Sequence, residues 1–242
     1  MTPYAKPRDS LASLAVHWPE LIPYFEEMDM DYCCQGNTPL EDMCNQANLP
    51  VRRVLKDCNK IIIDNGEQAV HWENASPGKV VEYIRDHFNR GHQQAFEQLI
   101  PLADAVLAEE SERLPELVPR LYQMIRWLVD DFAPHLHREE CLIFPLAYKL
   151  QSATAQTIKP GLHALLEPLE QMEQEHLMAA NLLNELKSIT SNYCPPIDSG
   201  PAYRELCDVL RGLDSTLRRH MHLENNILYP KLRQLNRLVA AG

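Results

Sequence analysis

Glycine is scarce in this chain, and long hydrophobic runs are missing from it. The 242 residues include only eight glycines, and none of them falls in a GxGxxG or GxxxxGKS/T pattern. The usual signatures of dinucleotide and nucleotide-phosphate binding are therefore excluded. No run of about 18 apolar residues occurs, and the first residues lack the charged-then-apolar pattern of a signal peptide. We expect a cytoplasmic protein that does not associate with a membrane.

Basic residues are also in short supply. Thirty-four acidic residues stand against 23 basic ones, which gives a formal net charge of −11. The few lysines and arginines are scattered, which argues against nucleic acid as a partner. The seven cysteines are an odd number and do not fit the even disulfide framework of a small secreted fold. We therefore expect reduced thiols.

Helical periodicity runs through most of the chain. Apolar residues recur at helical spacing over four long segments, residues 79–110, 118–149, 161–191 and 202–240. Shorter helical pieces precede them, residues 9–17, 19–28, 38–47 and 50–63. The sequence therefore predicts an all-α fold, in which a small helical N-terminal domain (1–65) is joined by a linker near residues 64–77 to an up-down four-helix bundle (78–242).

A repeat occupies two of the long segments. Residues 135–145 (HLHREECLIFP) and 220–230 (HMHLENNILYP) share both histidines, the glutamate and the closing proline. In each copy a histidine and a glutamate stand at positions i and i+4, so both side chains project from one helix face. The pairs His135/Glu139 and His220/Glu224 therefore have the spacing of two ligands of one metal site.

The helix before each copy carries a further histidine. His176 precedes His220 by 44 positions, and His92 precedes His135 by 43. His87 competes with His92 for the first-helix position, although its offset of 48 to His135 fits the duplication less well. The bundle is therefore interpreted as an internal duplication with one level of ligands across four helices.

Four histidines and two glutamates are too many ligands for one tetrahedral zinc and suit two iron ions. Glu139 and Glu224 would bridge the two metals, and open positions would remain for oxygen species or nitric oxide. Asp131, one turn before His135, and Glu175, beside His176, could orient a ligand or give iron a path outward. The second histidine of each repeat, His137 or His222, should point away from the site.

With these motifs, the sequence resembles the hemerythrin-like di-iron proteins called repair of iron centres proteins. That family has a small N-terminal domain with a segment similar to residues 28–34 (MDMDYCC), and its C-terminal half resembles residues 175–176 and 220–230. The resemblance covers nearly the whole chain and implies an oxo- or carboxylate-bridged di-iron centre. Carried over by position, the iron ligands fall on His135, Glu139, His176, His220 and Glu224. The family's outer carboxylates fall on Asp131 and Glu175, the former an Asp in place of the expected Glu.

The first helix departs from the family pattern. The family has a close His-x-x-His pair there, whereas His87 and His92 are five positions apart in this chain. An ungapped match favours His92 as the ligand and keeps His87 as the alternative.

Adjacent cysteines, Cys33 and Cys34, lie in the N-terminal domain. A disulfide between neighbours would close a small strained ring, so these residues suit thiol exchange, nitrosothiol chemistry or transient iron handling. We interpret them as the reactive thiols of the protein.

The resemblance implies a protein that supports the repair of iron–sulfur clusters damaged by nitric oxide or oxidative stress, binding or donating iron. Its partners would be the damaged iron–sulfur proteins, with nitric oxide or oxygen species as ligands of the centre. Two alternatives remain open, a nitric oxide or peroxide reductase and an oxygen or nitric oxide sensor. A homodimer is compatible with the small N-terminal domain.

Overall fold

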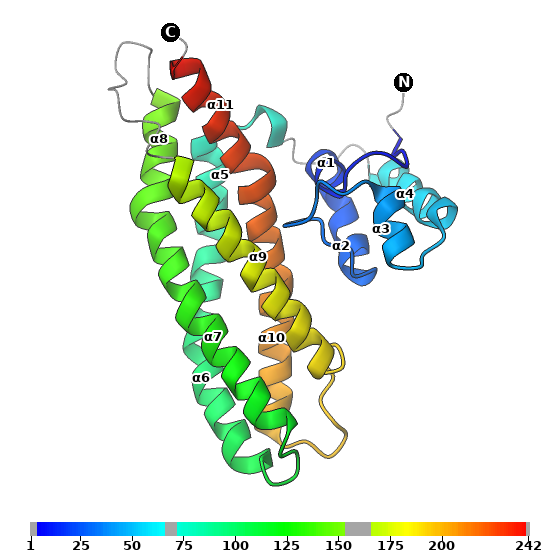
Figure 1. Cartoon of the computed structure of the whole chain (residues 1–242), viewed down its shortest axis with the longest axis vertical. Helices are drawn as coiled ribbons and strands as arrows, with labels where there is room; N and C mark the ends of the chain where they lie inside the picture. The colour runs from blue at the N-terminus through cyan, green and yellow to red at the C-terminus, as the bar shows by residue number, and fades with distance from the viewer. Residues whose placement is uncertain (1–3, 66–71, 153–165, 241–242) are drawn as a thin grey trace.

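A computed structural model describes residues 4–65, 72–152 and 166–240. Its long helices form an up-and-down bundle, with the N-terminal helices at one side (Figure 1). The bundle helices are α5 (Pro77–Ile84), α6 (Arg90–Glu110), α7 (Leu117–Arg138), α8 (Phe144–Ser152), α9 (Leu166–Ile189), α10 (Pro201–Leu223) and α11 (Tyr229–Ala240). Within the described residues there is no β-strand, only an isolated bridge between Ser10 and Pro39. The expected all-α fold class is confirmed.

Neighbours in sequence are neighbours in the bundle. Helix α6 packs against α7 and α10, α7 packs against α9, and α9 packs against α10. Short connections between such helices make them antiparallel. Ser76 caps α5, because its hydroxyl accepts the N–H of Lys79, and Pro77 suits the first turn of that helix. Pro101 lies inside α6, which continues through it.

Three of the long segments contain a π-helical turn, which the sequence analysis did not anticipate. The turns are Arg85–Asn89, Glu139–Ile143 and Glu224–Leu228. The helical segments expected over residues 79–110, 118–149 and 202–240 are present, and each contains one such turn. A π turn takes one extra residue into a helix, and such turns often mark functional sites. Two of the three begin at the repeated glutamates.

The N-terminal module, residues 4–65, consists of four short helices and a 3₁₀ turn at Pro19–Leu21. Its helices are α1 (Leu11–His17), α2 (Ile22–Glu27), α3 (Leu40–Gln46) and α4 (Val51–Asn65). In the region expected to be a linker, the residues Trp72–Asn74 form a second 3₁₀ turn, and Trp72 is buried. Residues 66–71 and 161–165 of the expected elements lie outside the described residues. The domain boundaries 1–65 and 78–242 stay predictions.

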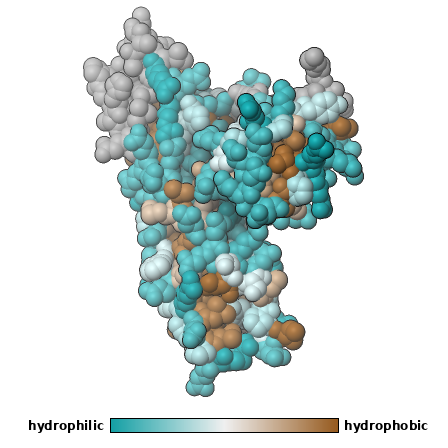
Figure 2. Space-filling view, turned by 45° about the vertical axis from the view of Figure 1, so that its right-hand side comes forward, coloured by the Kyte–Doolittle hydropathy of each residue, from teal (hydrophilic) through white to brown (hydrophobic). Residues whose placement is uncertain are grey.

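Two apolar clusters form the core. One joins the module to the lower half of the bundle in Figure 1 and contains residues such as Phe25, Tyr32 and Leu217. The other fills the upper half, between α5, α8 and α11. The surface turned to the viewer in Figure 2 is mostly hydrophilic, with small separate hydrophobic areas. None of the described helices is long and apolar enough to cross a membrane.

Candidate metal centre

A layer of buried histidines and glutamates crosses the bundle. Each of its six side chains is at most 1% exposed, and we call them the histidine–glutamate layer: His92, His135, Glu139, His176, His220 and Glu224. Buried polar side chains are costly unless they are paired or bind a metal. The structure thus brings together in one layer all six side chains that the sequence analysis selected, taking His92 for the first helix.

Two histidines face each other on one side of the layer. The Nε2 atoms of His135 and His176 are 2.9 Å apart. The Nδ1 atom of His135 lies 2.7 Å from a carboxylate oxygen of Glu175, and that of His176 lies 2.8 Å from Oδ1 of Asn225. Because each acceptor holds the proton on Nδ1, both Nε2 atoms present lone pairs. Two lone pairs at this distance repel each other, and a cation between them removes the repulsion. This donor set fits a metal.

The two glutamates lie between this histidine pair and His220. Oε1 of Glu139 is 2.7 Å from Nε2 of His135, and its Oε2 is 3.5 Å from Nε2 of His220. Oε2 of Glu224 is 3.2 Å from Nε2 of His176 and 3.5 Å from Nε2 of His220. Glu139 thus presents one oxygen to each of two nitrogens, which is the arrangement that a bridging carboxylate needs, and Glu224 faces two nitrogens with a single oxygen.

Several of these atoms are buried and have no hydrogen-bond partner of acceptable geometry. They are both carboxylate oxygens of Glu139 and Glu224 and the Nε2 atoms of His92 and His220. Short N–O distances in the layer therefore join atoms that converge on a point instead of forming hydrogen bonds. Four of the side chains, His135, Glu139, His176 and Glu224, offer ligand atoms within 4.8 Å of one another.

Burial controls the protonation of the carboxylates. In the absence of a cation, burial and then the neighbouring Glu224 raise the pKa of Glu139 well above its usual range. Burial acts in the same direction on Glu224, but His220 and His176 outweigh it and lower the pKa of that carboxyl. Two adjacent buried carboxylates cannot both be ionised at low cost without a positive charge between them. A metal cation would supply that charge.

His92 occupies the remaining side of the layer. Its ring stacks on that of His220 with centroids 5.3 Å apart, and it hydrogen bonds to the main chain of Thr216. Burial, followed by the proximity of His220, lowers its pKa to about 2, so the imidazole is neutral. His87 is exposed and stacks on Tyr83 outside the layer. Of the two first-helix histidines, only His92 lies in the layer.

The two acids that could orient a ligand differ in position. Glu175 accepts hydrogen bonds from His135 and, at 2.6 Å, from Arg138. Burial opposes ionisation of Glu175, but these contacts outweigh it and lower its pKa to about 2. Asp131 is exposed and contacts none of the layer's residues, although it lines the same cavity of about 350 Å³ as Glu175. An orienting role is thus geometrically open to Glu175 and not to Asp131.

The adjacent cysteines approach the layer from the module. Sγ of Cys34 lies 3.6 Å from the main-chain oxygen of His176, and Cys33 is buried beside it. The side-chain amide of Asn225 donates to the main-chain oxygen of Cys33 at 3.2 Å, and that of Asn226 does so at 3.1 Å. The cysteines are therefore held against the helix that carries two of the layer's residues.

Sequence reasoning missed three residues that hold this contact. His222 was expected to point away from the site. It is buried against the module, where its ring centroid lies 5.3 Å from that of Tyr32. Asn225 and Asn226 were overlooked, although the repeat contained a signal. The first copy has Glu140 and Cys141 at those positions. The two copies thus differ where one of them contacts the module.

Comparison with known proteins agrees with this geometry. Residues 83–232 match the family model described as the hemerythrin HHE cation binding domain, which covers more than half of the chain. The chain belongs to the hemerythrin HHE family. Residues 7–61 match a domain of unknown function, DUF542. The order of these two domains confirms the resemblance to the repair of iron centres proteins.

Curated relatives of this hemerythrin HHE protein match over almost their whole length. The chain is 29% identical over 229 residues to a probable iron-sulfur cluster repair protein of Haemophilus influenzae, covering 93% of this chain and 96% of the relative. It is 26% identical over 224 residues to the iron-sulfur cluster repair protein YtfE of Escherichia coli, covering 91% and 94%. A third relative, YtfE of Musicola paradisiaca, is 26% identical over 227 residues, covering 92% and 95%.

Proposed function

We propose that the histidine–glutamate layer holds two iron ions and that the protein supports the repair of damaged iron–sulfur clusters. The metal assignment rests on one observation: the Nε2 atoms of His135 and His176 face each other with their lone pairs, 2.9 Å apart, beside two buried carboxylates. Iron accepts both imidazole and carboxylate ligands. The names of the relatives, which match over nearly the full chain, support the repair function.

Two ions fit the layer better than one. Glu139 directs one oxygen toward His135 and the other toward His220, so the two nitrogens lie on different sides of the carboxylate. One ion would be held by His135 and His176, and the other by His220 and His92, with Glu139 and Glu224 shared between them. Six donors exceed the four of a structural zinc site.

The bound iron pair would supply exchangeable iron and open coordination positions for nitric oxide or oxygen species. The chain's own residues prepare the site. Glu175 and Asn225 fix the protons of His135 and His176 on Nδ1, which leaves Nε2 free to bind metal. Phe132 stacks on His135 with ring centroids 4.6 Å apart and excludes water from that side.

Damaged iron–sulfur proteins are the partners that this function requires. The odd number of cysteines in the chain suits the reducing environment of the cytoplasm. A homodimer stays a prediction. The reactive role expected for Cys33 and Cys34 is part of this proposal, because Cys34 lies beside His176 and Cys33 lies beside Cys34. Turnover of nitric oxide or peroxide without any repair would instead favour the reductase alternative.

The test combines metal analysis with a repair assay. Anaerobically purified protein should contain two irons per chain with the Mössbauer spectrum of a coupled pair, and it should restore a nitric oxide-damaged iron–sulfur dehydratase. The double variant Glu139→Ala/Glu224→Ala should stay helical and lose both iron and repair. Two irons retained in that variant would refute the bridging assignment. Two irons with no repair in the wild type would refute the function.

A further inference from the structure

A second group of potential metal ligands lies outside the histidine–glutamate layer, in residues 31–34, which we call the dithiol loop. The Sγ atoms of Cys33 and Cys34 are 3.4 Å apart, and Sγ of Cys33 lies 3.2 Å from Oδ1 of Asp31. The three side chains offer ligand atoms that all lie within 4.8 Å of one another. Two sulfurs and a carboxylate oxygen thus converge in one place.

These separations are close to those of a tetrahedral metal site. Metal–sulfur bonds of about 2.3 Å and metal–oxygen bonds of about 2.1 Å place two sulfurs about 3.8 Å apart and a sulfur and an oxygen about 3.6 Å apart. The Sγ–Sγ distance of 3.4 Å and the Sγ–Oδ1 distance of 3.2 Å need only small adjustments to reach these values. A disulfide would instead require the sulfurs to approach to about 2.0 Å within a strained ring.

The dithiol loop is held in this shape by its own main chain and by the bundle. Oδ1 of Asp31 accepts the main-chain N–H of Cys33 at 3.0 Å and that of Cys34 at 2.9 Å. From the other side, Asn225 and Asn226 donate to the main-chain oxygen of Cys33. The ligand atoms are therefore positioned before any cation arrives, which lowers the cost of binding.

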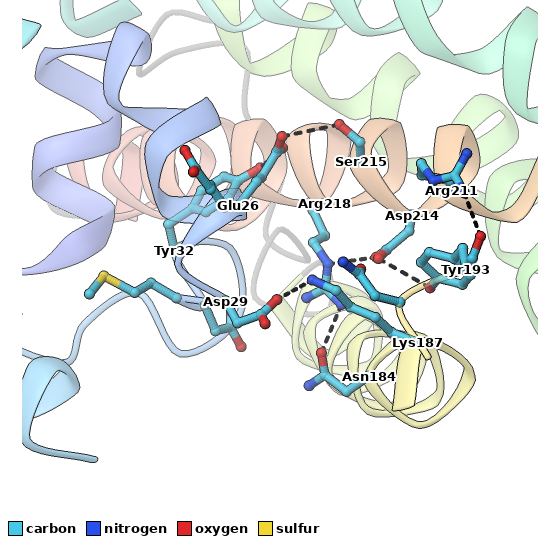
Figure 3. A pocket seen from close by; sticks show the side chains of 14 residues that line it. Glu26, Asp29, Tyr32, Asn184, Lys187, Tyr193, Arg211, Asp214, Ser215 and Arg218 are labelled. Carbon is cyan, nitrogen blue, oxygen red and sulfur yellow. Dashed lines mark hydrogen bonds and ion pairs between the residues drawn. The ribbon is translucent and has the colours of Figure 1, made fainter. Parts of the chain in front are cut away.

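Access also favours a cation at this place. Asp31 lines a cavity of about 300 Å³ between the module and the bundle. Figure 3 shows the basic side chains of that cavity engaged with partners: Lys187 with Asp29, Arg211 with the main-chain oxygen of Tyr193, and Arg218 with Asp214. Arg218 also acts on Cys33 electrostatically and lowers the pKa of that thiol, which favours the thiolate form that a cation binds.

We propose that Asp31, Cys33 and Cys34 form a second metal-binding site, which takes a divalent transition-metal cation such as Fe²⁺ or Zn²⁺ through two thiolates and one carboxylate. Mixed sulfur and oxygen ligation suits cations of this borderline class. With three protein ligands, a fourth position stays open, as expected of a site that passes a metal on instead of holding a fold together.

Binding requires both thiols to lose their protons. The contact with Cys34, and then burial, raise the pKa of Cys33 well above its usual range. The thiol is therefore protonated at neutral pH without a metal. The cation replaces two protons, which leave to solvent, and no electron is transferred.

The site is separated from the histidine–glutamate layer by a single side chain. Asn225 contacts Cys33 and Cys34 through its amide nitrogen and His176 through its amide oxygen. If the cation is iron, the dithiol loop would give iron a transient binding site beside the centre. This part of the proposal rests on the proposed function. Metal binding itself does not depend on it.

Co²⁺ tests the proposal, because thiolate ligands give this ion intense charge-transfer absorption. The full chain carrying Glu139→Ala/Glu224→Ala, which removes the carboxylates of the layer, is titrated with Co²⁺ under reducing conditions. We expect one equivalent to bind with thiolate-to-cobalt absorption. If this variant does not fold, the iron-loaded wild-type protein is titrated instead.

Variants of the loop and of other cysteines decide the assignment. Cys33→Ser and Cys34→Ser should abolish the absorption, and Asp31→Asn, whose amide oxygen can still accept both N–H groups, should weaken binding by at least about tenfold. The matched control replaces the two exposed cysteines, Cys141 and Cys194, with serine and should keep the absorption. The proposal would be overturned if the thiolate-to-cobalt absorption were absent from the parent protein, or if it were lost only in the control variant. Iron analysis of the wild type separately reports whether the di-iron assignment fails.

Discussion

The sulfur of Cys34 lies 3.6 Å from the main-chain oxygen of His176, although 142 positions separate them in sequence. Asn225 joins the same two parts of the chain. Its amide oxygen is 2.8 Å from Nδ1 of His176, and its amide nitrogen is 3.2 Å from the main-chain oxygen of Cys33. The carboxamide of Asn225 therefore orients a proposed iron ligand and also holds the dithiol loop, so the histidine–glutamate layer and the dithiol loop form one structural unit.

Replacing this carboxamide should weaken iron binding. Asn225→Ala removes the acceptor of the Nδ1 proton of His176, and loss of such a partner typically costs about 10–100-fold in metal affinity. Asn225→Asp keeps an acceptor and should keep the iron. Competition with an iron chelator, followed over time, measures the difference. The matched control is Asn226→Ala, because Asn226 holds the dithiol loop without touching His176. Equal iron retention in Asn225→Ala and the wild type would contradict the role.

The two first-helix histidines should behave differently. His92 is buried in the layer with an unpartnered Nε2, whereas His87 is exposed on the surface of the bundle. We expect His92→Ala to bind less than two irons per chain and His87→Ala to bind the full amount. Elemental analysis of anaerobically purified protein gives the answer. A loss of iron in His87→Ala alone would transfer the ligand role to that residue.

Local rules made the histidine–glutamate layer predictable. Residues at i and i+4 share a helix face, and the duplication extends that rule to His92 and His176 on the preceding helices. These arguments need no knowledge of how distant parts of the chain meet. They also selected Asp131, which shares a helix with His135, but that side chain is exposed and reaches none of the six.

The features that escaped prediction depend on tertiary contacts. Nothing in the helical period around His222 indicates burial, because the module that covers it comes from almost 200 positions earlier. The π turns at Glu139 and Glu224 are equally hidden, since one extra residue in a turn leaves the apolar pattern on both sides recognisable. Docking of the module, not local propensity, gives Asn225 and Asn226 their contacts.

Glu26 should anchor the N-terminal module to the bundle. Its carboxylate accepts hydrogen bonds from Arg219 at 3.0 and 2.9 Å, from the hydroxyl of Tyr32 at 2.8 Å and from that of Ser215 at 3.2 Å. We expect Glu26→Ala to lower the free energy of unfolding by about 1–3 kcal/mol, because three donors lose their acceptor. Urea denaturation measures this loss.

The same variant should expose the dithiol loop, because Tyr32 precedes Cys33 directly. Alkylation of Cys34 by iodoacetamide, located by mass spectrometry, should become faster. Glu41→Ala is the matched control, since Glu41 belongs to the same module and forms only an exposed pair with Arg8 at 3.7 Å. Unchanged stability and alkylation in Glu26→Ala would show that apolar contacts alone hold the module in place.

In the iron-free protein, the free energy of unfolding should fall as the pH rises. A Glu carboxyl in the unfolded chain titrates near 4.5, whereas burial and Glu224 raise the pKa of Glu139 in the folded chain well above that. Between these two values the native state holds a proton that the unfolded state has lost, so the free energy of unfolding decreases with pH, by up to about 1.4 kcal/mol per pH unit. Below 4.5 the lowered pKa of Glu224 acts in the opposite sense, because protonation of that carboxylate destabilises the fold.

Chelator-treated protein should therefore lose thermal stability above about pH 4.5. Glu139→Gln, which carries no titrating proton, should remove this decrease, and iron-loaded protein should not show it, because the cations neutralise both carboxylates. Differential scanning calorimetry across the pH range compares the three samples. The difference between the apo wild type and apo Glu139→Gln isolates this carboxyl from all other titrating groups. If the two apo-proteins followed the same pH curve, Glu139 would not hold the buried proton, and the electrostatic basis for placing cations between the two glutamates would be lost.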